Sequence, residues 1–263
     1  MTTLEKKVSE LIDIKGSDET SRSQRIKKLQ EIGAELLTKY EIRVNNITIE
    51  PLRVEPYFFK KNVFEDKFIH RKVLENGICY GPSQRDRFGK LYIHKGFSGV
   101  DIVLSNSEEY AFSFLIKRSR ILIDNKVEYP FVKQYDVAKI LKKHGITDDY
   151  DKMVLFEKES PNNTIVFKTI RNGLKTIAER PDFSKEEQNL YNDLLISSFI
   201  ELKEHTSSQH GFATGYGGDR AVIEYLKEYK LLHPNTRIKE LDKLRRELYP
   251  NGSKTEFEKV FNK

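Results

Sequence analysis

The sequence has one cysteine, no tryptophan and no long apolar run. Because Cys79 has no second cysteine to pair with, an internal disulfide framework and a cysteine-rich zinc site are both excluded. No apolar stretch approaches the roughly 18–20 residues of a membrane span. The N-terminal segment is acidic as well as basic and lacks the apolar core of a signal peptide. We therefore expect a cytoplasmic, intracellular protein with no membrane partner.

Sequence motifs of several enzyme classes are also missing. The chain has no GxxxxGK[ST] phosphate loop, no GxSxG nucleophile elbow and no HExxH zinc motif. Its six histidines show no metal-ligand spacing, apart from His205 and His210 in a glycine-rich polar segment. We therefore expect chemistry that uses no metal ion and no organic cofactor.

The chain does have enough apolar residues for a core and an excess of positive charge. It contains 263 residues, of which 38% are hydrophobic, and Lys and Arg outnumber Asp and Glu by 46 to 40. The excess is concentrated, because Lys and Arg outnumber Asp and Glu by four over 51–130 and by three over 207–263. This balance favours a polyanionic partner such as nucleic acid. An ordinary Lys-rich surface that keeps the protein soluble explains it equally well.

Hydrophobic periodicity predicts helical ends around a strand-rich middle. Apolar residues recur at helical spacing over 4–12 and 26–40, and Ser21 or Ser23 is the expected N-cap of the second helix. Further helices are predicted at 134–144, 184–204 and along 220–263. β-branched and aromatic residues predict strands at 42–59, 91–94, 100–105, 110–123 and 164–170.

These patterns indicate an α+β fold with a central antiparallel or mixed β-sheet and flanking helices. The expected organisation is an N-terminal helical extension at 1–40, an α+β core at 41–204, a Gly-rich linker at 205–219 and a C-terminal helical segment at 220–263.

The segment from 53 to 120 contains the residues best suited to chemistry. Glu55 lies among apolar and aromatic residues at the end of a strand-like run, where burial would suit a general acid or base. A solvated glutamate at a sheet edge is the alternative. The stretch 80–94 mixes arginines with aromatic residues, which suits phosphate contacts and base stacking but also a solvated hairpin.

The order of these pieces resembles the methylpurine-DNA glycosylases, also called alkyladenine or 3-methyladenine DNA glycosylases. The resemblance covers about seventy residues and rests on short motifs in the order of that family. They are Val54-Glu55-Pro56-Tyr57, EDKFIH at 65–70, PSQRDRFGKLYIH at 82–94, FSG at 97–99 and FLIKR at 114–118. Pro56 stands where the family has Ala, His94 stands where it has Tyr, and about four residues are inserted after Tyr57.

The resemblance implies a DNA glycosylase that flips a modified purine out of double-stranded DNA and hydrolyses its N-glycosidic bond. It implies that Glu55 activates water, that Tyr57, His70 and His94 hold the base, and that Phe97 is the candidate intercalating residue. Asp101 is a possible second acid without a family role. The expected DNA-backbone contacts are Arg85, Arg87, Lys90, Lys95, Lys117 and Arg118.

Two alternatives remain open at this point. In the first alternative, the protein binds nucleic acid on the same scaffold without catalysing a reaction. In the second, it is an N-glycosidic hydrolase that acts on a nucleoside, a nucleotide or another modified base. Asp101, His94 and the insertion after Tyr57 motivate the second alternative.

Overall fold

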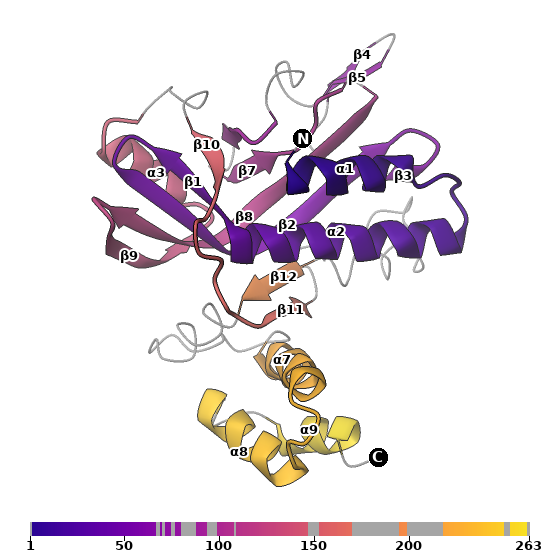
Figure 1. The fold of residues 1–263 in the computed structure, drawn as a ribbon, viewed down its shortest axis with the longest axis vertical. Coiled ribbons are helices and arrows are strands. Elements are labelled where there is room, and N and C mark those ends of the chain that lie inside the picture. The colour runs from indigo at the N-terminus through magenta and orange to yellow at the C-terminus, as the bar shows by residue number, and fades with distance from the viewer. Residues whose placement is uncertain are drawn as a thin grey trace. The chain divides into compact units, whose positions relative to one another are not determined.

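The computed structural model describes residues 2–66, 69, 72–74, 77–79, 88–93, 99–107, 109–146, 153–169, 195–198, 218–249 and 253–261. The chain divides into two compact units, Met1–Asn162 and Asn163–Lys263. Helices and antiparallel strands together confirm the predicted α+β class (Figure 1). Among the described helices, none has both the length and the apolar character that crossing a membrane requires.

The first unit is built on an antiparallel sheet whose strands follow the order β10-β1-β2-β8-β7-β6, with β3 also paired to β2 and β9 to β8. Strands β4 and β5 form a separate hairpin. Its helices are α1 (Thr3–Asp13), α2 (Glu19–Lys39) and α3 (Val137–Lys143). Its strands are β1 (Tyr40–Val44), β2 (Ile47–Lys60), β3 (Phe64–Glu65), β4 (Lys72–Leu74), β5 (Gly77–Cys79), β6 (Leu91–Ile93), β7 (Val100–Val103), β8 (Tyr110–Ile123), β9 (Lys126–Lys133) and β10 (Val154–Glu157).

The helical patterns at the N-terminus are confirmed as α1 and α2, but the expected cap of α2 was wrong. Asp18 is the N-cap, and its side chain accepts a hydrogen bond from the Ser21 backbone N–H at 3.0 Å. Asp, like Ser, satisfies an N–H group that has no partner inside the helix. Gly16 precedes this cap with a φ of +83°, a conformation that favours glycine.

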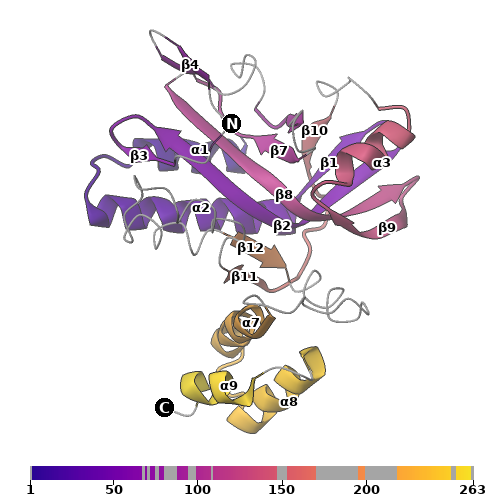
Figure 2. The ribbon, with the colours of Figure 1, turned by 180° about the vertical axis from the view of Figure 1, so that it is seen from behind.

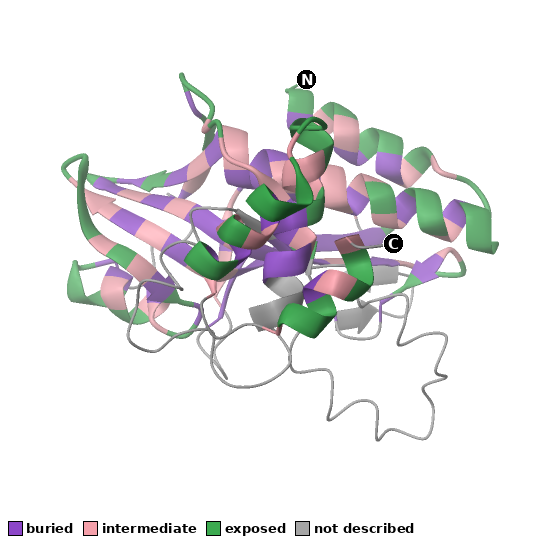
Figure 3. Ribbon diagram, turned by 90° about the horizontal axis from the view of Figure 1, so that it is seen from below, coloured by how far each residue is buried: buried purple, intermediate pink, exposed green. Residues whose placement is uncertain are grey.

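Side chains alternate between the two faces of the long strands β2 and β8. Val54, Phe58 and Phe112 are fully buried, and Lys60, on the same face as Phe58, donates to the Ile12 carbonyl in α1 at 3.1 Å. This face therefore carries the main core under α1 and α2. Figure 3 shows the alternation of buried and partly exposed positions along the strands, and Figure 2 shows the opposite face of the sheet, turned away from these helices.

The second unit contains β11 (Val166–Thr169), β12 (Leu195–Ser198), α7 (Gly218–Leu232), α8 (Ile238–Leu248) and α9 (Lys254–Phe261). The helices of the tail agree with the helical pattern predicted along 220–263. Side chains from β11 and all three helices form one apolar cluster, consisting of Phe167, Val222, Tyr225, Leu226, Leu241, Leu248 and Phe257.

Two predictions of local structure were wrong in this unit. Residues 195–198 form β12, paired with β11, instead of the C-terminal half of a helix at 184–204. An apolar run such as Leu194-Leu195-Ile196 fits either structure, and the available strand partner decides between them. Gly218 and Asp219 belong to α7 instead of the linker, and residues 205–217 lie outside the described residues.

Candidate functional site

The candidate site lies on the face of the sheet opposite α1 and α2, where three strands place polar side chains in one row. Glu55 on β2 is paired with Leu115 on β8, and Leu115 is paired on its other side with Asp101 on β7. Residues paired directly across antiparallel strands point to the same face. Glu55 and Asp101 therefore share a face, separated by two strand spacings, or about 10 Å between backbones.

The neighbouring row on this face adds a tyrosine and a serine. Tyr57 is paired with Ser113, which is paired in turn with Val103. The sequence around Glu55 produces this arrangement through simple alternation, because Val54, Pro56 and Phe58 occupy the core face and leave Glu55 and Tyr57 on the other. The polar Ser113 inside the apolar run YAFSFLI was the only sequence signal for its role, and it was missed.

Glu55 is buried and is contacted through both carboxylate oxygens. Glu55 as a whole residue is 1% exposed to solvent. The Tyr57 hydroxyl donates a hydrogen bond to Oε1 at 2.8 Å, and Lys117 Nζ lies 3.3 Å from Oε2. Burying a carboxylate is costly unless hydrogen bonds and a counter-charge compensate it. These two contacts therefore hold Glu55 in place and stabilise its negative charge.

Lys117 is two residues along β8 from Leu115, the partner of Glu55, so alternation places it on the face of Glu55, and a β-bulge lies at the same point. The strand pairing passes from Val54–Ile116 to Arg53–Arg118, so Lys117 is the extra residue on β8. Bulges of this kind redirect a side chain and are common beside active sites. The sequence predicted Lys117 as a DNA-backbone contact, and the structure pairs it with the carboxylate that was predicted to activate water.

Asp101 is a second buried carboxylate on the same face. It is 2% exposed, and the Ser113 hydroxyl donates to its Oδ2 at 2.8 Å. Tyr92 on β6 lies directly opposite Asp101 in the strand pairing. Two carboxylates, a lysine, a serine and two tyrosines are thus gathered on one face of four neighbouring strands.

An apolar cluster adjoins the carboxylates and includes the predicted base-binding Tyr57. Its buried members are Phe59, Ile69, Val103 and Ala111, and the rings of Tyr57 and Tyr92 pack against them. Tyr92 was not predicted as a site residue; the resemblance implied His94, two residues further along the chain. Of the predicted site residues, His70, His94, Phe97, Arg85, Arg87 and Lys95 lie outside the described residues.

The remaining predicted phosphate contacts occupy two different places. Lys90 lies between two strands: it forms an isolated antiparallel bridge with Val154 of β10, and its carbonyl accepts a hydrogen bond from the Val103 N–H at 2.9 Å. Arg118 lies beside the bulge, with its guanidinium carbon 5.2 Å from the centre of the Phe131 ring. Its Nη1 donates to the Lys117 carbonyl at 2.9 Å.

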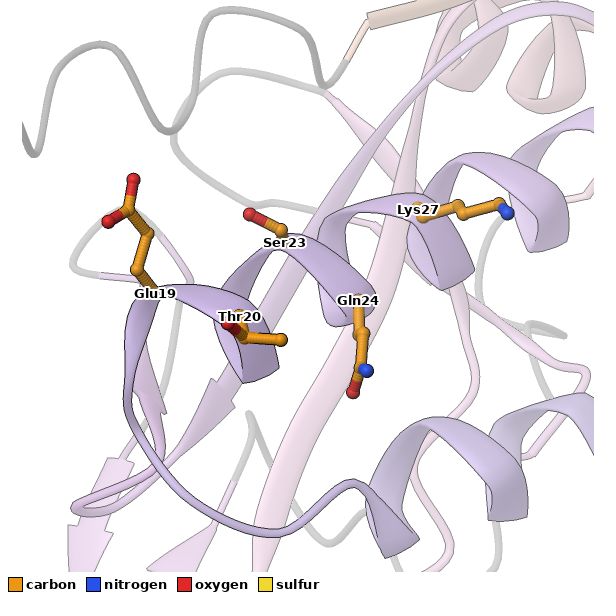
Figure 4. A pocket seen from close by; sticks show the side chains of 5 residues that line it. All are labelled: Glu19, Thr20, Ser23, Gln24 and Lys27. Carbon is orange, nitrogen blue, oxygen red and sulfur yellow. The ribbon is translucent and has the colours of Figure 1, made fainter.

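A surface hollow lies away from these residues, along the first turns of α2 (Figure 4). Its lining consists of Glu19, Thr20, Ser23, Gln24 and Lys27. Figure 4 shows that these side chains project in different directions and do not converge on one point. The hollow contains none of the predicted site residues. Within the described ranges, no three His, Cys, Asp or Glu side chains gather as metal ligands would.

Comparison with known proteins identifies no relative of this chain. No protein-family model matches it, no curated protein matches it, and no solved structure matches it.

Proposed function

We propose that this protein hydrolyses the N-glycosidic bond of a modified purine in DNA, with Glu55 as the general base. The observation that carries the proposal is the buried carboxylate of Glu55, contacted by the Tyr57 hydroxyl at 2.8 Å and by the Lys117 ammonium at 3.3 Å. A carboxylate fixed at both oxygens in a water-poor setting is suited to orienting one water molecule for attack. The resemblance to the methylpurine-DNA glycosylases supports the same role for Glu55.

The proposed reaction needs the base to leave the duplex first. Rotating a nucleotide out of the stack costs a few kcal/mol, and stacking on aromatic rings returns about 1–3 kcal/mol per base. The apolar cluster beside Glu55 offers the rings of Tyr57 and Tyr92 for this purpose. A cationic alkylated base binds such rings more strongly than a neutral one, since the ring face attracts positive charge.

In the hydrolytic step, Glu55 takes a proton from water as the water oxygen forms a bond to the sugar C1′. The C1′–N bond breaks, and its electron pair leaves with the base, so the products are a free base and an abasic site. Positive charge develops on the sugar as the bond breaks, and negative groups nearby stabilise it. Asp101, which is paired with Leu115 and lies on the same face of the sheet as Glu55, supplies such a negative group.

The test is base release from duplex DNA that carries alkylated purines, followed by mass spectrometry. We expect the wild-type protein to release the base and Glu55→Gln to lower the rate at least ~100-fold, as expected when a general base is removed. Glu50→Gln is the matched control, because Glu50 lies on the same strand and also pairs with cations, Lys158 at 3.1 Å and Arg120 at 3.4 Å. Intact alkylated DNA, or full activity in Glu55→Gln, would contradict the proposal.

Asp101 favours a second candidate function, the hydrolysis of a free nucleoside or nucleotide. A buried carboxylate accepts hydrogen bonds from sugar hydroxyls, and free nucleosides and nucleotides carry hydroxyls that are esterified within a DNA strand. The same mass spectrometric measurement, applied to alkylated DNA and to free nucleosides and nucleotides, separates the candidates. Salt-dependent DNA binding without release of any base would identify a binding protein.

A further inference from the structure

We infer that Lys117 gives this protein a second activity, the cleavage of a DNA strand at an abasic site through an imine with the sugar. The inference rests on the proposed function, because an abasic site is what the proposed hydrolysis leaves in the strand. Imine chemistry needs a lysine amine, a neighbouring group that accepts its proton, and access for the carbonyl substrate. Lys117 combines these three properties beside Glu55.

The amine of Lys117 lies within the candidate site. Its Nζ is 3.3 Å from Glu55 Oε2, and Leu115, two residues earlier on β8, is the strand partner of Glu55. The proposed hydrolysis requires the sugar C1′ to lie one water molecule away from Glu55. A sugar bound in this way also has its C1′ near the Lys117 amine, which sits on a flexible four-carbon stem.

The Lys117 side chain is accessible although its partner is buried. The two side chains are 19% and 2% exposed, respectively. Lys158 forms a similar ion pair with Glu50 at 3.1 Å, but the Lys158 side chain is only 6% exposed, and Glu50 lies on the other side of the bulge from Glu55. A purely structural ion pair needs no exposure of the amine, whereas a reacting amine does.

Lysine is also the residue type that this chemistry requires. An arginine would neutralise Glu55 as well, and its planar guanidinium would bind the carboxylate with two hydrogen bonds. A guanidinium keeps its proton in proteins and does not attack carbonyl carbons. A lysine amine does so once a neighbouring base has taken its proton, and the Glu55 carboxylate is such a base.

The first half of the reaction forms the imine. Lys117 gives one proton to Glu55, and the free amine forms a bond to the C1′ aldehyde carbon of the open-chain abasic sugar. A second proton passes from the nitrogen to the former aldehyde oxygen. Glu55 then returns its proton to that hydroxyl group, and water leaves as the protonated C1′=N bond forms.

The second half of the reaction cuts the strand. Glu55 takes a proton from C2′, the electron pair of that C–H bond forms the C2′=C3′ double bond, and the C3′–O bond breaks with its pair leaving on the phosphate. Water then hydrolyses the imine, which restores the Lys117 ammonium and leaves an unsaturated aldehyde on the 3′ end. Glu55 gives its proton to solvent, so no metal, oxidant or reductant is consumed.

Trapping with sodium borohydride on preformed abasic DNA tests the inference. The probe is a fluorescein-labelled duplex with one abasic site, made by enzymatic removal of a single uracil. Borohydride adds hydride to the C1′=N bond and joins the protein covalently to the strand. Lys117→Arg, which keeps a counter-charge for Glu55, should lower the rates of trapping and of strand cleavage at least ~100-fold, because it removes the nucleophile. Lys126→Arg replaces an exposed lysine on β9 and is the matched control, expected to react within twofold of the wild type.

Peptide mass spectrometry of the trapped wild-type complex identifies the attached residue without relying on the folding of any variant. A sugar remnant on Lys117 supports the inference. Absence of a trapped complex, or attachment to the N-terminus or to another lysine, would overturn it. Circular dichroism of Lys117→Arg shows whether its loss of trapping comes from misfolding.

Failure of this inference and failure of the proposed hydrolysis give different results, because the abasic probe needs no base release. If alkylated DNA releases no base but the abasic strand is trapped on Lys117, the hydrolysis is wrong and the strand cleavage stands. If base release depends on Glu55 but the abasic strand is neither trapped nor cut, the role of Lys117 as a nucleophile is wrong and the hydrolysis stands.

Discussion

Replacing Lys117 by methionine should destabilise the first unit by about 3 kcal/mol, and about half of this cost should disappear when Glu55 is also replaced by glutamine. Lys117 Nζ and Glu55 Oε2 are 3.3 Å apart, and the two side chains are 19% and 2% exposed. Methionine keeps the apolar stem but removes the ammonium, so a buried carboxylate loses its counter-charge. Removing one partner of a buried ion pair costs about 3–5 kcal/mol.

The geometry of the ion pair places the expected cost of Lys117→Met at the lower end of this range. At an effective dielectric constant near 20, charges at this distance attract by about 5 kcal/mol, and desolvation of both groups offsets part of that. The Lys117 side chain is partly exposed, so Glu55→Gln alone leaves an ammonium that can turn to solvent and should cost only about 1 kcal/mol. The double variant carries no charge in the pair and should cost about 1–2 kcal/mol.

The measurement is urea denaturation followed by far-UV circular dichroism, since the chain has no tryptophan for fluorescence. With a slope near 2 kcal/mol per M, a loss of about 3 kcal/mol moves the midpoint by about 1.5 M. Lys126→Met replaces an exposed lysine on β9 and serves as the control, with an expected change within about 0.5 kcal/mol.

A double-mutant cycle tests whether the ion pair between Lys117 and Glu55 stabilises the protein. We expect a coupling energy of about 2 kcal/mol between Lys117 and Glu55. If the effects of the two substitutions add within about 0.5 kcal/mol, the ion pair contributes nothing to stability, and the reasoning from its burial is refuted.

Two further predictions concern groups away from the site. Burial raises the pKa of Tyr40 and of Tyr225 to about 12. Because the unfolded chain ionises these tyrosines near pH 10 and the folded protein does not, stability should fall as the pH rises from 10 to 12. Absorbance titration at 295 nm should lose a late-titrating group in Tyr40→Phe, and tyrosines that all titrate near pH 10 would contradict this. Arg25 is fully buried and donates from Nη2 to the carbonyls of Ile14 at 2.5 Å and Gly16 at 2.7 Å, so Arg25→Met should cost about 2–3 kcal/mol by urea denaturation, against little change for the control Lys27→Met.

The elements predicted best are those whose pattern is local. The stripe that begins at Leu4 marks α1, and the run rich in aromatic and apolar residues at 110–123 marks β8 with the bounds that the structure shows. Both signals lie within the segment itself and do not depend on what packs against it.

The strands that were missed depend on partners distant in sequence or on exposed positions. β9 is mostly exposed and follows a turn in which Asp124 and Asn125 have φ values of 50° and 61°, a hairpin signal that was overlooked. β10 pairs with β1, more than a hundred residues earlier, and its own sequence is too short to indicate a strand. The same dependence on a partner explains why 195–198 became a strand.

The sequence by itself determined that Glu55 and Tyr57 share one face of a strand, because side chains alternate with a period of two. It also determined that Asp101 lies on a strand. Only the tertiary structure decided that Leu115 pairs with both Glu55 and Asp101, since strand register depends on contacts between segments far apart in the chain. The contact of Lys117 with Glu55, and the bulge that pairs Arg53 with Arg118, also depend on this register. The composition indicated only an excess of positive charge, whereas the register of β2, β8 and β9 places part of that positive charge beside the buried carboxylates.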